Sequence, residues 1–211
     1  MINDSKQLID GINRGGQDFG LTMGSGGTRE IPGNITTDLL DHENVDISGD
    51  IFEVLAALDD NSVASIYASH FIEHIDDLNQ LLTEIVRVSR DGAKINLIAP
   101  HFSNAFFYSD VTHRKFFGLY TFCYLAEDRS GLRRKMPGYA QIPHLRHLNA
   151  SLIFKSYRPY YVRHAFRKFI GFLVGLTTYT KELYEEAGTG IISCYEINYT
   201  LTVSKPQQVL K

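Results

Sequence analysis

A glycine-rich turn and two acidic residues downstream of it have the types and spacing of a nucleoside site. Gly24-Ser25-Gly26-Gly27 follows the apolar segment 18–23, and glycines at such a place let the backbone approach a ligand closely. Asp38 ends the next apolar segment, where a carboxylate can accept both hydroxyl groups of a ribose. Asp50 follows at a distance that suits an adenine amino group. The order and spacing of these residues predict a nucleoside-binding site.

The same turn fits other nucleotide sites poorly. A dinucleotide fingerprint needs a third glycine three residues after the second, where this chain has Arg29. The acidic residue of that fingerprint also follows about 20 residues on, whereas Asp38 comes much sooner. The sequence Gly-Lys-Ser/Thr of a phosphate-binding loop is absent. Hydride transfer and phosphoryl transfer are therefore disfavoured.

The segment from His70 to His74 matches H-x-x-E-H, a zinc-peptidase motif. That motif needs a helix that holds both histidines over a cleft, together with a distant third ligand. Here it directly follows a predicted strand. We therefore expect Glu73 and His74 to pack against the start of the next helix, and we expect no metal.

Two further histidines are candidate catalytic bases. His101 and His113 flank an aromatic segment that we expect to form a cap over the site and to exclude water from it. Histidine has a pKa suited to removing a proton from a hydroxyl group. His101 directly follows a strand, and His113 has Asp110 nearby as an orienting partner. Either histidine could instead only bind the substrate or hold the cap.

Alternating strand and helix patterns must position these residues. The apolar segments that end in polar or glycine-rich turns predict strands over 18–23, 34–39, 64–68 and 94–99. Helical spacing of apolar residues predicts helices over 51–58 and 77–90. The segments 151–157 and 191–204 are rich in β-forming residues. We expect an α/β fold with a doubly wound, mostly parallel sheet that an antiparallel C-terminal edge strand completes.

Length and composition indicate one domain. The chain has 211 residues, of which 44% are hydrophobic and 21% charged. Within this domain we expect a binding core over about 17–100, a cap over 101–150 and completion of the sheet over 151–211. Cys123 and Cys194 are too few for a disulfide framework. Neither a membrane-spanning run nor a secretory signal is visible, so we expect a cytoplasmic protein without a membrane partner.

Charge is distributed unevenly along the chain. The stretch 129–168 holds ten Lys or Arg residues and no Asp or Glu, among them Arg129, Arg133, Arg134, Lys135 and Arg146. This stretch is either a solvated surface or a basic wall that faces an anionic substrate. Dedicated nucleic-acid binders are basic overall, whereas this chain has a net charge of -3, so we expect no nucleic-acid partner.

Several blocks together resemble a compact branch of the class I S-adenosylmethionine-dependent methyltransferases, similar to type 11. They are Leu21–Gly26, Ile31–Asp38, Ser65–His74, Ala99-Pro100-His101 and Asp110–Arg114. The resemblance implies a Rossmann-like seven-stranded sheet. It also implies that S-adenosyl-L-methionine binds with its methionine part at Gly24, Ser25 and Gly26, its ribose at Asp38 and its adenine at Asp50 and Ile51. Ser69 and His70 would close the pocket.

Two positions depart from the branch. Many relatives carry an acid two residues before the first glycine, where this chain has Thr22, and the helix between the first two strands is nearly absent.

We expect O- or N-methylation of a small acceptor that is anionic or of carbohydrate type. Phosphorylated or nucleotide-linked sugars and surface polysaccharide precursors have this chemistry. The alternative is a non-catalytic module that binds a nucleotide or a partner on the same fold.

Overall fold

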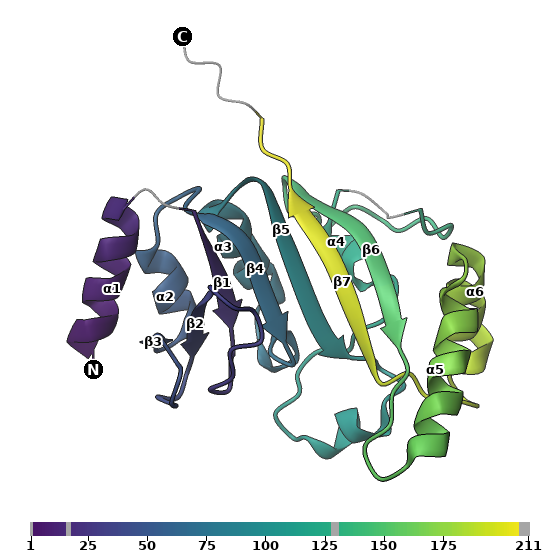
Figure 1. Ribbon diagram of the computed structural model, residues 1–211. Helices are drawn as coiled ribbons and strands as arrows, with labels where there is room; N and C mark the ends of the chain where they lie inside the picture. Colours follow the sequence, from purple (N-terminus) through teal and green to yellow (C-terminus); the bar gives the residue numbers. More distant parts are fainter. Residues whose placement is uncertain (1, 16–17, 128–130, 207–211) are drawn as a thin grey trace.

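The computed structural model describes residues 2–15, 18–127 and 131–206, and its centre is a seven-stranded sheet (Figure 1). The strands are β1 (Phe19–Met23), β2 (Ile35–Asp38), β3 (Ile47–Ser48), β4 (Val63–Ser69), β5 (Ser89–Pro100), β6 (Leu145–Ile153) and β7 (Glu196–Val203). Their order in the sheet is β3-β2-β1-β4-β5-β7-β6. The first five strands pair in parallel, whereas β7 is antiparallel to both of its neighbours.

This topology confirms the predicted α/β fold with a mostly parallel, seven-stranded sheet and an antiparallel C-terminal strand. The position of that strand needs a correction, because β7 lies between β5 and β6, and β6 forms the edge. Strand β6 also starts earlier than the predicted segment 151–157. Its first half carries the polar residues Arg146, His147 and Asn149 and a register shift, which hide the strand pattern.

In the described part of the chain, helices and short helical turns join the strands, and one helix precedes the first strand. The helices are α1 (Ile2–Gly15), α2 (Ile51–Ala57), α3 (Leu78–Val88), α4 (Thr121–Leu125), α5 (Tyr161–Gly175) and α6 (Thr178–Leu183). The short turns are η1 (Ile72–His74), η2 (Ala105–Ser109) and η3 (Tyr184–Gly188). The predicted helices over 51–58 and 77–90 are confirmed as α2 and α3, and Asp50 and Asp77 cap their N-termini. No helix in the described part of the chain is long and apolar enough to cross a membrane.

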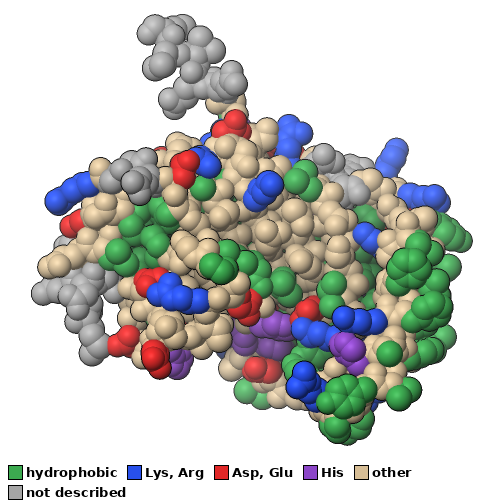
Figure 2. Space-filling model, in the orientation of Figure 1, with side chains coloured by type: hydrophobic (Ala, Val, Ile, Leu, Met, Phe, Trp, Pro, Cys, Tyr) green, Lys and Arg blue, Asp and Glu red, His purple; other side chains and the backbone are tan. Residues whose placement is uncertain are grey.

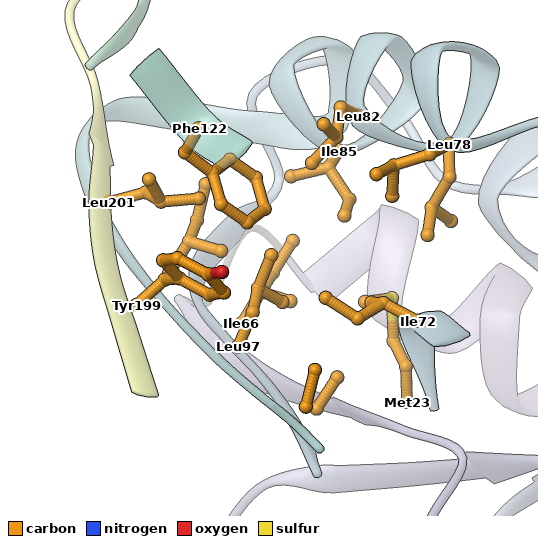
Figure 3. Packing of buried hydrophobic residues seen from close by; sticks show 14 of the residues in the cluster. Met23, Ile66, Ile72, Leu78, Leu82, Ile85, Leu97, Phe122, Tyr199 and Leu201 are labelled. Carbon is orange, nitrogen blue, oxygen red and sulfur yellow. The ribbon is translucent and has the colours of Figure 1, made fainter. Parts of the chain in front are cut away.

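The hydrophobic core lies mainly on one face of the sheet. Leu82 and Ile85 of α3 are fully buried against the central strands, where Ile66 and Leu97 point toward them (Figure 3). Along β5, residues on the core side are buried, whereas Asn96 on the other side is only half-buried. Such alternation is expected of a strand with one face packed on the core.

The opposite face of the central strands is polar. Within the described residues, Figure 1 shows α3 and α4 behind the sheet and no helix in front of β4, β5 and β7. The half-buried side chains on these strands include Tyr67, Asn96 and Thr200. The segment between β1 and β2 contains turns instead of a helix, as expected from the sequence. The helices of this α/β fold therefore cover the two faces unevenly.

The segment between β5 and β6 is aromatic, as predicted, and only part of it is packed. Phe107 and Phe117 are buried, whereas Phe106, Tyr108 and Phe116 are exposed. A second aromatic group, which the sequence analysis did not predict, lies on α5 with Phe166, Phe169 and Phe172 exposed. Both groups follow strands whose carboxyl ends lie at the lower edge of the sheet in Figure 1.

Candidate active site

The glycine turn is fastened to the carboxyl end of β2. The amide of Gly26 donates to Asp38 Oδ2 at 2.8 Å, and the amide of Leu40 donates to Asp38 Oδ1 at 3.0 Å. Next to Gly26, the amide of Ser25 donates to the carbonyl of Thr37 at 3.0 Å. Gly24 and Gly26 have φ angles of 63° and 55°, which glycine adopts without steric cost. Asp38 thus holds the turn and keeps further lone pairs for a ligand.

A cavity of about 320 Å³ opens at this place, and we call it the donor cavity. It is lined by Gly24, Thr37, Asp38, Leu39, Gly49, Asp50, Ile51, Phe71, His74 and Ile75. The structure therefore brings four predicted cofactor residues together, namely Gly24, Asp38, Asp50 and Ile51. Asp50 also caps α2, because its Oδ1 accepts from the amide of Phe52 at 2.8 Å.

Sequence reasoning missed the apolar walls of the donor cavity. Leu39, Phe71 and Ile75 line it. Leu39 directly follows β2, whereas Phe71 and Ile75 flank η1 after β4. Leu39 is 71% exposed, so its side chain is accessible to a ligand in this cavity. Only the place of Leu39, next to Asp38 at the strand end, gave a signal in the sequence.

Ser69 and His70 do not line the donor cavity. His70 pairs instead with two carboxylates, with Nε2 at 3.0 Å from Glu196 Oε2 and Nδ1 at 3.5 Å from Glu73 Oε1. Glu196, followed by Glu73, raises the pKa of His70 to about 9, so this ring is a cation at neutral pH. Lys155 Nζ contacts the other oxygen of Glu196 at 2.9 Å. His70 therefore lies in a network of charged side chains at the carboxyl end of β4.

His113 lies close to the donor cavity. Its Nε2 is 3.7 Å from Asp110 Oδ2, so the predicted pair is brought together. The His113 ring contacts the ring of His74, a wall residue of the donor cavity, with ring centres 4.9 Å apart. Hydrogen bonds from Thr112 hold the pKa of Asp110 below its usual value, so Asp110 is ionised beside His113.

His101 lies in the interior. The residue is fully buried, with Nδ1 at 2.8 Å from Ser103 Oγ and Nε2 at 3.4 Å from Glu185 Oε2. Both ring nitrogens thus have partners, and the residue does not line the donor cavity. Of the two candidate bases, only His113 contacts a wall residue of that cavity.

Larger cavities lie near the basic stretch, and two of them bear on the predicted basic wall. One, of about 660 Å³, follows β6 and is lined by Ser156, Tyr157, Arg158, Tyr160, Tyr161 and His164; we call it the aromatic cavity. The other, of about 520 Å³, brings Arg133 and Arg134 together with three glutamates, Glu182, Glu185 and Glu186. Lys135 and Arg146 are exposed, and Arg129 lies outside the described residues. The predicted basic wall is therefore partly compensated by acids.

The face in Figure 2 shows histidine side chains next to acidic and basic ones along the lower edge of the molecule. This edge holds the carboxyl ends of the parallel strands (Figure 1), where ligands of open α/β sheets bind.

Comparisons with known proteins agree with this architecture. Residues 35–97 match the family described as methyltransferase domain. A comparison with curated protein sequences found no match. Among solved structures, a SAM-dependent methyltransferase from Archaeoglobus fulgidus is similar with a TM-score of 0.55 and 16% identity, over 95% of this chain and 96% of its own.

Two further solved structures have a similar fold. The YcgJ protein from Bacillus subtilis has a TM-score of 0.51 and 14% identity, over 97% of this chain and 99% of its own. A geranyl diphosphate C-methyltransferase from Streptomyces coelicolor A3(2) has a TM-score of 0.51 and 11% identity, over 95% of this chain and 77% of its own. The chain therefore has the fold of these solved methyltransferases, and its residues 35–97 match the methyltransferase-domain family. Both findings agree with the predicted resemblance and with S-adenosyl-L-methionine as the expected cofactor.

Replacing Asp38 by alanine is expected to weaken binding of S-adenosylhomocysteine about ten- to a hundredfold. The variant loses a charged acceptor for two ribose hydroxyls, and hydrogen bonds to charged groups contribute about 1.5–3 kcal/mol. Calorimetric titration measures the affinity, and a thermal melt shows whether the turn that Asp38 holds is still folded. The exposed Asp41 offers a matched control as Asp41→Ala. Unchanged affinity in a folded Asp38→Ala variant would remove Asp38 from the site.

Proposed function

We propose that this protein transfers the methyl group of S-adenosyl-L-methionine to an oxygen or nitrogen of a small acceptor, which is anionic or of carbohydrate type. The observation that carries the proposal is the contact between His74, in the wall of the donor cavity, and His113, which has Asp110 beside it. A histidine–carboxylate pair thus stands next to the cavity in which the sulfonium is expected. Such a pair suits the removal of a proton from an acceptor.

The chain's part in the reaction is alignment and proton removal. Methyl transfer is a displacement at carbon, so nucleophile, methyl group and sulfur must lie in line. His113 Nδ1 lies 2.9 Å from the carbonyl of Phe107, which only accepts, so Nδ1 carries the proton. Nε2 of the neutral ring is then free to take a proton from the acceptor, and the Asp110 carboxylate stabilises the cation that forms.

The aromatic cavity supports the class of acceptor. Its tyrosine rings offer flat faces to a sugar, and Arg158 offers a planar fork of donors suited to phosphate. Arg158 belongs to the acid-free stretch 129–168 and replaces Arg133 and Arg134 as the preferred anion contact, because those two face glutamates. Phosphorylated or nucleotide-linked sugars, including surface polysaccharide precursors, combine both features.

These placements support a division of the chain into a donor side and an acceptor side. We propose one methyltransferase domain over 1–211, with donor binding in about 17–100. The acceptor side is formed by 101–150 together with the segment between β6 and β7, which holds the aromatic cavity.

A methylation screen is expected to give faster turnover with phosphorylated or nucleotide-linked sugars than with their neutral counterparts. Rising salt should raise the apparent KM for such acceptors because screening weakens the attraction of Arg158. The Arg158→Gln variant should raise KM by about tenfold at unchanged donor affinity, since a charge-assisted contact is worth about 1.5–3 kcal/mol. A matched control is Arg146→Gln, which alters an exposed arginine on β6. A preference for neutral acceptors contradicts the anionic class, and donor binding with no transfer to any acceptor favours a non-catalytic module.

A further inference from the structure

A buried carboxylate without hydrogen bonds lies beside the donor cavity. The Glu73 side chain is 1% exposed, and neither of its carboxylate oxygens has a hydrogen-bond partner. The neighbouring ring nitrogens are His70 Nδ1 at 3.5 Å and His113 Nε2 at 4.0 Å, and both distances are longer than an ordinary hydrogen bond. Because a buried carboxylate without a hydrogen bond is costly even beside a cation, such a group in a native protein is typical of a site that an ion or ligand completes.

Two histidines near Glu73 each keep a lone pair on Nε2. His113 donates from Nδ1 to the carbonyl of Phe107, which leaves the lone pair on Nε2. His74 Nδ1 lies 2.9 Å from Thr112 Oγ1, and the Thr112 hydroxyl donates to Asp110 Oδ1 at 2.6 Å. The Thr112 oxygen therefore accepts from His74, and the lone pair of His74 is also on Nε2. Metal-binding histidines are typically fixed by such a bond from their other ring nitrogen.

We propose that Glu73, His74 and His113 bind a divalent transition-metal ion such as Zn²⁺, Mn²⁺ or Co²⁺. One ligand atom from each of the three residues lies within 4.8 Å of the others. Two imidazoles and one carboxylate form a ligand set for these ions that leaves coordination positions open for a substrate. His70, the first residue of the H-x-x-E-H segment, is not part of this group, because its Nε2 is directed to Glu196 Oε2 at 3.0 Å.

The fold brings the three ligands together from two distant parts of the chain. Glu73 and His74 belong to η1, directly after β4, and His113 belongs to the loop after β5. The amide of Arg114 donates to the carbonyl of Glu73 at 2.7 Å, which fastens this loop beside η1.

The proposed ion would act on the acceptor, and this step rests on the proposed function. His74 lines the donor cavity, so the ion lies at its wall and an acceptor hydroxyl can bind one of the open positions. Binding to a divalent ion lowers the pKa of an oxygen ligand. The hydroxyl then loses its proton to water while the O–CH3 bond forms and the S–CH3 bond breaks, and S-adenosylhomocysteine leaves. In this form the ion takes over the activation that His113 would otherwise perform as a base.

Metal binding is tested directly on the full chain, without an acceptor. Protein freed of metal by a chelator is titrated with Co²⁺ and followed by visible absorption and by the melting temperature. We expect one ion per chain and a rise in the melting temperature, because a ligand that binds the folded state stabilises it. Glu73→Gln and His113→Ala should each weaken Co²⁺ binding at least about tenfold, since removal of even an orienting partner costs ten- to a hundredfold. The exposed His42 provides the control as His42→Ala, which should bind like the parent.

Each outcome decides the proposal. If Co²⁺, Mn²⁺ and Zn²⁺ bind equally well to the parent and to both ligand variants, or do not bind at all, the site is refuted. Circular dichroism shows whether a variant is folded. Because Glu73→Gln and His113→Ala differ in chemistry, the test still stands if one of them fails to fold. Calorimetry with S-adenosylhomocysteine on the same samples tests the donor cavity separately. Metal binding without binding of S-adenosylhomocysteine would overturn the proposed function and leave the metal site intact. Binding of S-adenosylhomocysteine without metal binding would overturn the metal site and leave the proposed function intact.

Discussion

His113→Ala is expected to lower kcat by about 10²–10⁴-fold while the affinity for S-adenosylhomocysteine stays within about twofold. A positioned base typically contributes a factor of this size to the rate. His113 is held by Phe107 through Nδ1 and has Asp110 at 3.7 Å from Nε2, so its loss removes an oriented group and leaves the glycine turn untouched. Single-turnover kinetics with a substrate from the acceptor screen measures the effect.

His101 provides the comparison for this experiment. Because His101 is fully buried and bonded at both ring nitrogens, His101→Ala should mainly lower the melting temperature. Its kcat, measured where the variant is folded, should fall much less than that of His113→Ala. The opposite ranking would make His101 the base and remove His113 from catalysis. Near-normal turnover in both variants would leave alignment as the main contribution of the enzyme.

Gly24→Ala is expected to destabilise the protein by about 2–5 kcal/mol and to abolish donor binding. The φ angle of 63° costs a residue with a Cβ about 1–2 kcal/mol. An added Cβ would also lie 2.3 Å from Phe71 Cδ2, and relief of such overpacking costs about 1–3 kcal/mol. The Phe71 ring is a wall of the donor cavity, so its displacement changes the shape of the site. Chemical denaturation measures the free energy of unfolding.

Gly26 is a matched control in the same turn. Its φ angle is 55°, but an added Cβ meets no atom within 4 Å. Gly26→Ala should therefore cost only the backbone part, about 1–2 kcal/mol. A second substitution, Phe71→Ala, should recover part of the stability that Gly24→Ala loses. Equal losses of unfolding free energy in the two glycine variants would show that the contact with Phe71 does not contribute to the destabilisation.

Most of the sheet could be predicted because its strands are buried and end in turns. Strands β1, β2, β4 and β5 are apolar segments bounded by glycine or acidic turns, and α3 has a clear helical spacing. Helix α5 was not predicted because most of its apolar residues face solvent, so their spacing does not outline a face packed on the core. The place of β7 inside the sheet depends on pairing partners that no local pattern encodes.

The donor cavity could be predicted better than the acceptor side. Gly24, Asp38 and Asp50 follow consecutive strands, and parallel strands bring their carboxyl ends to one edge. Glu73 and His113 belong to separate motifs, and nothing local shows that the loop after β5 returns to η1. Their meeting depends on contacts between this loop and η1, among them the backbone bond from Arg114 to Glu73 and the hydrogen bond between His74 and Thr112. Contacts between distant loops are where reasoning from the sequence fails.

The inner position of β7 has a consequence for the order of folding. During synthesis, β6 emerges before the strand that joins it to the rest of the sheet, since β7 follows it in the chain and lies between β5 and β6. Until β7 pairs with both neighbours, β5 and β6 each expose an unpaired strand edge, and such edges favour aggregation. Closure of loops between strands distant in sequence is slow. This part of the sheet therefore assembles last, and a ribosome that stalls before Glu196 leaves a nascent chain that is prone to misassembly.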